Sequence, residues 1–73
     1  MNIREYSMCL ANATHNTEMA DRYEATYNMI VAGPRRPGDE LRLARLDVKI
    51  QAHDRLSFYW MRESDAYHAR YYR

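Results

Sequence analysis

The run from Asp39 to Arg73 constrains the fold most, because it contains no Gly, Pro or Asn. These residues most often end an element or form a turn, so their absence favours a single long helix. Side chains along the run recur at alternating steps of three and four residues, which keeps one face of a helix pointing in one direction. The sequence therefore predicts a helix over residues 39–71. The stripe on it consists of Leu43, Leu46, Ile50, His53, Ser57, Trp60, Ser64, Tyr67 and Tyr71.

A second stripe with the same spacing predicts a helix over residues 3–32. Its weak place is residues 12–17, where Asn and Thr have poor helix propensity and where Asn16 or Thr17 could cap a new helix. Because the stripe keeps its phase across this segment, we expect one continuous helix rather than two. The stripe is Ile3, Tyr6, Leu10, Ala13, Thr17, Ala20, Tyr27 and Val31, broken only by Glu24, with Met8, Cys9, Met19, Tyr23 and Ile30 beside it.

Residues 33–38, Gly-Pro-Arg-Arg-Pro-Gly, are the one clear break in the helical pattern. We expect Gly33 to adopt the left-handed conformation that closes a helix, and Pro34 cannot continue the helix. Such a short connection is typical of an antiparallel helix pair. Residues 46–50 alternate as a strand would, but residues 51–54 offer no turn residue for a hairpin, so a helix is favoured there. The predicted fold is all-α, a single domain formed by one long antiparallel helical hairpin.

A two-helix hairpin has a core only one layer deep and leaves apolar side chains uncovered. Residues 57–61 place bulky groups around the whole helix circumference, which is typical of a buried helix. We therefore expect the hairpin to dimerise into an antiparallel four-helix bundle or to dock on another protein. The uncovered side chains are Leu41, Val48, Leu56, Phe58, Tyr59 and Met61.

Composition limits the possible environments. The single cysteine excludes an internal disulfide and favours a reducing compartment. The chain has no long apolar run and no basic-then-apolar N-terminal segment, so we expect a cytoplasmic protein without a membrane span or secretory signal. Residues 1–34 carry a net charge of −2 and the remainder +3.

The sequence offers little for catalysis, and we expect no enzyme and no cofactor. A hairpin has no pocket of its own, Cys9 lies between apolar neighbours, and no glycine-rich phosphate loop or Ser-centred elbow occurs. His15, Glu18, His53 and Asp54 could meet at one level of the hairpin. They lack the helical His pair or Cys pair typical of zinc sites, so we expect no metal. Instead, we expect His53 to pair with Glu18 in a polar layer.

Our first functional hypothesis is a non-enzymatic protein–protein interaction module. Tyr, Trp and Arg are enriched at binding hot spots, and the second half of the chain is rich in them. We expect an inhibitor, anti-activator or adaptor of a larger protein, of the type that small phage or mobile-element regulators represent. The residues expected at the interface are Tyr59, Trp60, Tyr67, Arg70 and Tyr71, with Arg35 and Arg36 as a second contact.

The alternative hypothesis is a homodimeric four-helix bundle that binds RNA or DNA. The predicted architecture resembles that of the plasmid copy-control RNA-binding hairpin proteins, without a shared motif, so the resemblance assigns no residue a role. Against it, acidic residues interrupt each group of basic residues. The residues expected to contact nucleic acid are Arg35, Arg36, Arg42, Arg45 and Lys49.

Overall fold

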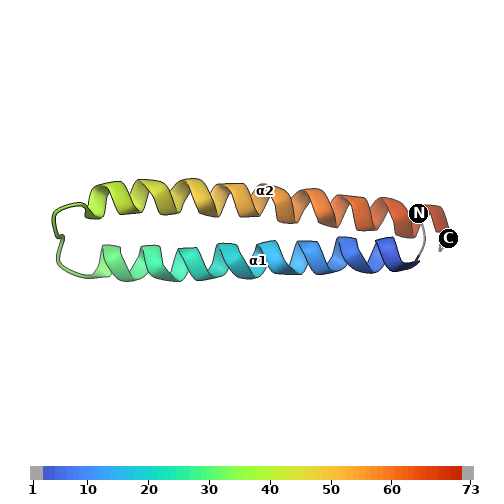
Figure 1. Cartoon of the computed structure of the whole chain (residues 1–73), viewed down its shortest axis with the longest axis horizontal. Coiled ribbons are helices and arrows are strands. Elements are labelled where there is room, and N and C mark those ends of the chain that lie inside the picture. The colour runs from blue at the N-terminus through green and yellow to red at the C-terminus, as the bar shows by residue number, and fades with distance from the viewer. Residues whose placement is uncertain (1–2, 72–73) are drawn as a thin grey trace.

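The computed structural model describes residues 3–71, with side chains for residues 4–70, as two antiparallel helices (Figure 1). Helix α1 spans Ile3–Ala32 and helix α2 spans Asp39–Tyr71, the bounds that the sequence predicts. The molecule measures 53 × 16 × 14 Å. The all-α hairpin prediction is confirmed, and residues 46–50 are helical.

Helix α1 runs without a break through its weak segment. Two polar side chains there turn back onto the carbonyls one turn earlier. Asn16 Nδ2 donates to the Asn12 carbonyl at 2.8 Å, and Thr17 Oγ1 donates to the Ala13 carbonyl at 3.0 Å. Such back-bonding satisfies the side chain inside a helix, so neither residue is needed as a cap.

From Leu43 to Tyr67 the buried stripe of α2 is the predicted one, whereas that of α1 is rotated toward one side. On α1 the side chains that face α2 are Tyr6, Cys9, Ala13, Asn16, Ala20, Tyr23, Tyr27 and Ile30. The prediction that Leu10 and Val31 lie in the core is wrong, since they are 43% and 47% exposed. Both stripes have the same three–four spacing and share every second member, so periodicity could not separate them. Packing against α2 selects the stripe with small residues at its centre.

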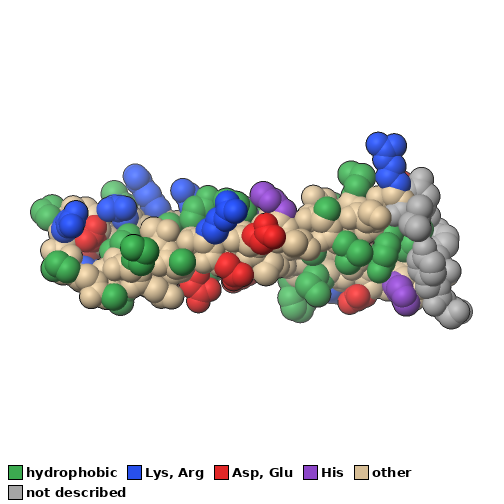
Figure 2. Space-filling view, turned by 90° about the horizontal axis from the view of Figure 1, so that it is seen from below, with side chains coloured by type: hydrophobic (Ala, Val, Ile, Leu, Met, Phe, Trp, Pro, Cys, Tyr) green, Lys and Arg blue, Asp and Glu red, His purple; other side chains and the backbone are tan. Residues whose placement is uncertain are grey.

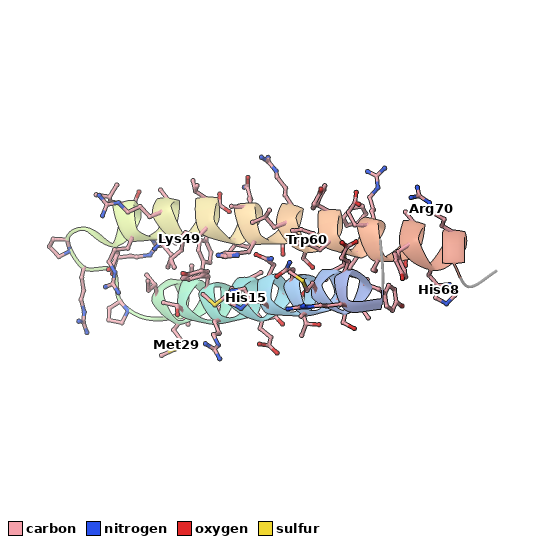
Figure 3. The ribbon with its side chains drawn as sticks, turned by 45° about the vertical axis from the view of Figure 1, so that its right-hand side comes forward. His15, Met29, Lys49, Trp60, His68 and Arg70 are labelled. Atoms are coloured by element: carbon pink, nitrogen blue, oxygen red, sulfur yellow. The ribbon has the colours of Figure 1, made fainter. Side chains whose placement is uncertain are left out.

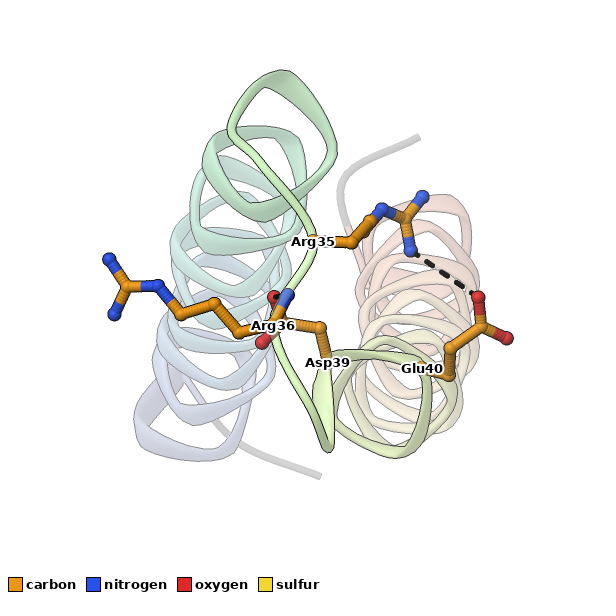
Figure 4. A network of polar contacts seen from close by, with 4 residues as sticks. All are labelled: Arg35, Arg36, Asp39 and Glu40. Atoms are coloured by element: carbon orange, nitrogen blue, oxygen red, sulfur yellow. Dashed lines mark hydrogen bonds and ion pairs between the residues drawn. The ribbon is translucent and has the colours of Figure 1, made fainter.

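The connection closes with a tight turn over Arg36–Asp39 (Figure 4). The Asp39 N–H donates to the Arg36 carbonyl at 3.1 Å, and the Arg36 N–H donates to Asp39 Oδ2 at 2.8 Å. Gly38 has φ of +87°. With Pro37 before it, this is the arrangement of a type II turn. The expectation for Gly33 is wrong, because Gly38 is the glycine with positive φ.

The core between the helices is thin. Among the described residues no large side chain is less than 2% exposed, and the buried apolar residues of α1 are small: Cys9, Ala13 and Ala20. The open end is closed by an aromatic pair, in which Tyr6 of α1 stacks on Tyr67 of α2 with ring centroids 5.1 Å apart. Neither described helix is long and apolar enough to cross a membrane.

Candidate interaction surfaces

A polar layer crosses the middle of the hairpin. His53 Nδ1 lies 2.8 Å from Asn16 Oδ1, and the hydroxyls of Thr17 and Ser57 lie 2.7 Å apart. The Tyr23 ring stacks on His53 at 5.6 Å, and Lys49 Nζ lies 5.3 Å from the centre of that ring. Figure 3 shows Lys49 reaching from α2 toward α1. These contacts tie the two helices at a defined register.

The predicted partner of His53 is wrong, because Asn16 and not Glu18 contacts it. Asn16 belongs to the stripe that actually faces α2, while Glu18 is exposed. Within residues 3–71 no three His, Cys, Asp or Glu side chains gather in a way that could hold a metal ion.

The aromatic residues predicted for an interface lie at different depths. Tyr67 is 5% exposed and belongs to the stack with Tyr6, whereas Tyr59 is 52% exposed. Trp60 is half-buried and meets the Tyr59 ring edge-on, with centroids 5.0 Å apart. Arg70 is exposed, and the side chain of Tyr71 lies outside the described residues. The accessible part of this group is therefore Tyr59, the edge of Trp60, and Arg70.

The two arginines of the loop differ in their contacts. Arg35 Nη1 lies 3.8 Å from Glu40 Oε1, an exposed ion pair that contributes little stability. The guanidinium of Arg36 points away from Asp39 and Glu40 (Figure 4). Arg42 Nη1 lies 3.7 Å from Asp39 Oδ1, whose carboxylate is buried. Arg36 is thus the loop cation that extends farthest from these carboxylates.

The corrected core phase defines two faces of the hairpin, one on each side of the core, in addition to the outer sides of the two helices. In an antiparallel pair, positions that flank the core on one side of both helices line one face, and those on the other side line the opposite face. One face, which we call the basic face, has its cations at Arg22, Arg42, Arg45, Lys49 and Arg70. The opposite acidic face carries Asp21, Glu24, Glu40, Asp47, Asp54 and Asp65.

Contacts and the surface view agree with this division. Thr26, Met29 and Arg42, from both helices, line one shallow hollow near the loop, as flanking positions on the same side should. Figure 2 shows Lys and Arg side chains along one edge of the loop half, with most Asp and Glu side chains toward the other edge. Acidic residues that seem to interrupt the basic clusters in sequence are therefore largely separated from them in space.

Each face also presents apolar side chains. The basic face has Leu56 (46% exposed) at its middle with Tyr59 beside it, and Met8 and Met29 farther out. The acidic face has Phe58 and Met61, 69% and 53% exposed, in the half nearer the termini. A shallow depression on α2 is lined by charged and aromatic residues, namely Asp54, Arg55, Phe58, Tyr59, Arg62 and Glu63.

Sequence reasoning missed Asn16 in the polar layer and Arg22 on the basic face. Both follow from the rotated α1 stripe, since Asn16 then faces α2 and Arg22 falls on the same side as Lys49 and Arg45. No signal in the sequence alone separates that stripe from its neighbour.

Comparisons with protein-family models, curated proteins and solved structures find no match for this chain.

Proposed function

We propose that this chain is a small non-enzymatic protein–protein interaction module, an inhibitor, anti-activator or adaptor that binds a larger protein and forms a homodimeric four-helix bundle. The observation that carries the proposal is the band of exposed bulky side chains, Phe58, Tyr59 and Met61, on a scaffold whose own core is one layer deep. Soluble proteins rarely leave large apolar patches uncovered unless a partner binds them.

The acidic face indicates what kind of surface the larger partner presents. It carries six carboxylates, of which Glu40 lies 3.8 Å from Arg35, and Phe58 and Met61 provide an apolar contact beside them. A basic protein surface with an apolar depression fits this arrangement, because complementary charge speeds encounter while buried aromatic groups provide affinity.

A capture experiment tests this proposal. The tagged chain is incubated with host lysate, with and without nuclease, beside a Phe58→Glu, Met61→Glu variant and a Val48→Glu control. Val48 is 67% exposed but lies on the outer side of α2, away from the acidic face. A stoichiometric protein that survives nuclease and is lost only with the double variant supports the proposal. Its retention by the double variant contradicts the assigned face.

A second candidate is nucleic-acid binding through the basic face. It is favoured by one observation: Arg22, Arg42, Arg45 and Lys49 come together on one side of the loop half. Four cations in one area can neutralise phosphates, and the affinity should then fall steeply with salt. Fluorescence anisotropy with labelled RNA and single-stranded DNA, at salt concentrations from about 50 to about 200 mM, tests this candidate. An Arg45→Gln, Lys49→Gln variant should reduce the salt slope, and salt-independent binding would contradict it.

A further inference from the structure

The middle of the basic face is apolar and lies at the midpoint of the hairpin. Thr17 contacts Ser57 and Tyr23 contacts His53, so Met19 and Leu56 lie between these contacts at the same level. This level is close to the midpoint of both helices. In a twofold interface a side chain on the axis packs on its own copy, so an uncharged apolar centre at the midpoint of a face suits such an interface.

We propose that two copies of this chain pack basic face against basic face, with their loops at opposite ends, around a twofold axis at the level of Met19 and Leu56. The inference rests on the proposed function, because it specifies the face, the direction and the register of the homodimer. Each helix then lies antiparallel to its own copy. Leu56 packs on the partner's Leu56, and Met19 on the partner's Met19.

The flanking residues of α2 are complementary under this symmetry. Lys49 and Glu63 lie seven residues before and after Leu56, so Lys49 of one copy lies opposite the partner's Glu63, and the reverse pair forms on the other side of the axis. Ala52 lies four residues before Leu56 and Tyr59 three residues after it, so Ala52 lies close to the partner's Tyr59, which places a large ring near a small side chain. Arg42 lies opposite the partner's Arg70, but Arg42 already has Asp39 as its counter-ion.

Charge disfavours the other twofold pairings of equal faces. With the loops together, Arg22, Arg42, Arg45 and Lys49 of both copies would lie at the same end and repel one another. Packing acidic face on acidic face would bring the carboxylates of two copies together, with Arg35 as the cation beside Glu40. Among the pairings of equal faces, the basic face with loops at opposite ends sets Lys49 over the partner's Glu63.

The size of the face is sufficient for a stable dimer. A face of 53 by 16 Å covers about 850 Å², close to the roughly 800 Å² that each partner buries in an interface of standard size. Burying it also covers Leu56, Tyr59, Met8 and Met29, which a single hairpin leaves exposed. The acidic faces remain accessible on both sides of the dimer.

A charge swap tests the register. Lys49 and Glu63 are separated by about 21 Å along one helix at about 1.5 Å per residue, so they cannot pair within a chain. Lys49→Glu and Glu63→Lys should each weaken the dimer about tenfold, as judged by sedimentation equilibrium, and the double variant should regain most of the loss, because the pair is restored in reverse. Loss without recovery in the double variant overturns the register. Val48→Glu is the control and should leave the dimer unchanged.

Spin labels test the direction. In a Cys9→Ala background, a label at Arg35→Cys should give a distance between copies close to the length of the molecule, 53 Å. A label at Leu56→Cys should give the shortest distance. Short distances between the loops overturn the inference. So does a Leu56 distance longer than that of a Phe58→Cys label on the acidic face.

The outcomes separate this inference from the proposed function. A dimer with another register or direction overturns the inference alone. If the chain has the mass of a monomer but still captures a partner through its acidic face, the dimer is overturned and the proposed interaction module stands. If the dimer shows the charge-swap recovery but captures no protein, the inferred register is supported and the proposal of a larger protein partner is contradicted.

Discussion

The two ends of the hairpin are held in different ways. At the loop end, the turn, the Asp39 carboxylate and Arg42 contact one another within a few residues of sequence. At the open end, Tyr6 and Tyr67 come from opposite ends of the chain and meet only because the two helices pack. Local contacts form at little entropic cost, whereas the distant pair depends on closing the whole chain. The open end should therefore be the more sensitive to loss of a single side chain.

The largest expected effect comes from Tyr67→Ala at the open end. Tyr67 is 5% exposed and stacks on Tyr6, so its removal loses apolar burial and leaves a cavity, at a cost of about 3 kcal/mol in the free energy of unfolding. Urea unfolding followed by circular dichroism measures it, at one fixed chain concentration because association is linked to stability. Phe58→Ala is the matched control, with 69% of the side chain exposed, and should change little. Equal losses in both variants would contradict the packing described for this end.

A smaller loss is expected from Asp39→Ala at the loop end. The carboxylate is buried, accepts the Arg36 N–H and lies beside Arg42, so its removal should cost about 1.5–2 kcal/mol, at the lower end of the range for hydrogen bonds to charged groups. Glu40→Ala is the control, because Glu40 is 94% exposed and its pair with Arg35 is solvated. The ratio of the two losses, measured by the same unfolding assay, decides whether Asp39 fixes the turn. Similar values for both variants would remove that role.

The same contrast explains what the sequence could predict. Helix bounds follow from local signals, namely the glycine–proline break at 33–38 and the acidic start at Asp39, and the structure places both helices at those bounds. The stripe of α2 was also correct, because its bulky members Leu43, Trp60 and Tyr67 leave one clear face. The predicted and observed stripes of α1 share their spacing, so only the packing partner could choose between them.

The partner of His53 illustrates the limit at the candidate site. The sequence predicts Glu18 as its partner, but the rotated phase of α1 brings Asn16 there instead. That rotation also decides which charges of α1 lie beside those of α2: it sets Arg22 on the side of Arg45 and Lys49, and Glu24 on the side of Asp47. Which charges share a face of the hairpin thus depends on a small rotation of α1 about its own axis. Local sequence signals do not encode this rotation.

The smallest effect is expected at the two glycines that flank the loop, and it tests local geometry alone. Gly38 has φ of +87°, and a Cβ there would meet no atom within 4 Å, so Gly38→Ala should cost about 1 kcal/mol purely through backbone strain. At Gly33 a Cβ would lie 3.5 Å from the Met29 carbonyl oxygen, an ordinary contact, and φ is not positive. Gly33→Ala should therefore leave stability unchanged or raise it by up to about 0.5 kcal/mol, since alanine restricts the unfolded chain. Thermal melts of the two variants beside the parent chain measure both. A larger loss at Gly33 than at Gly38 would mean that the first glycine closes α1 after all, and that the turn over Arg36–Asp39 does not hold the loop end.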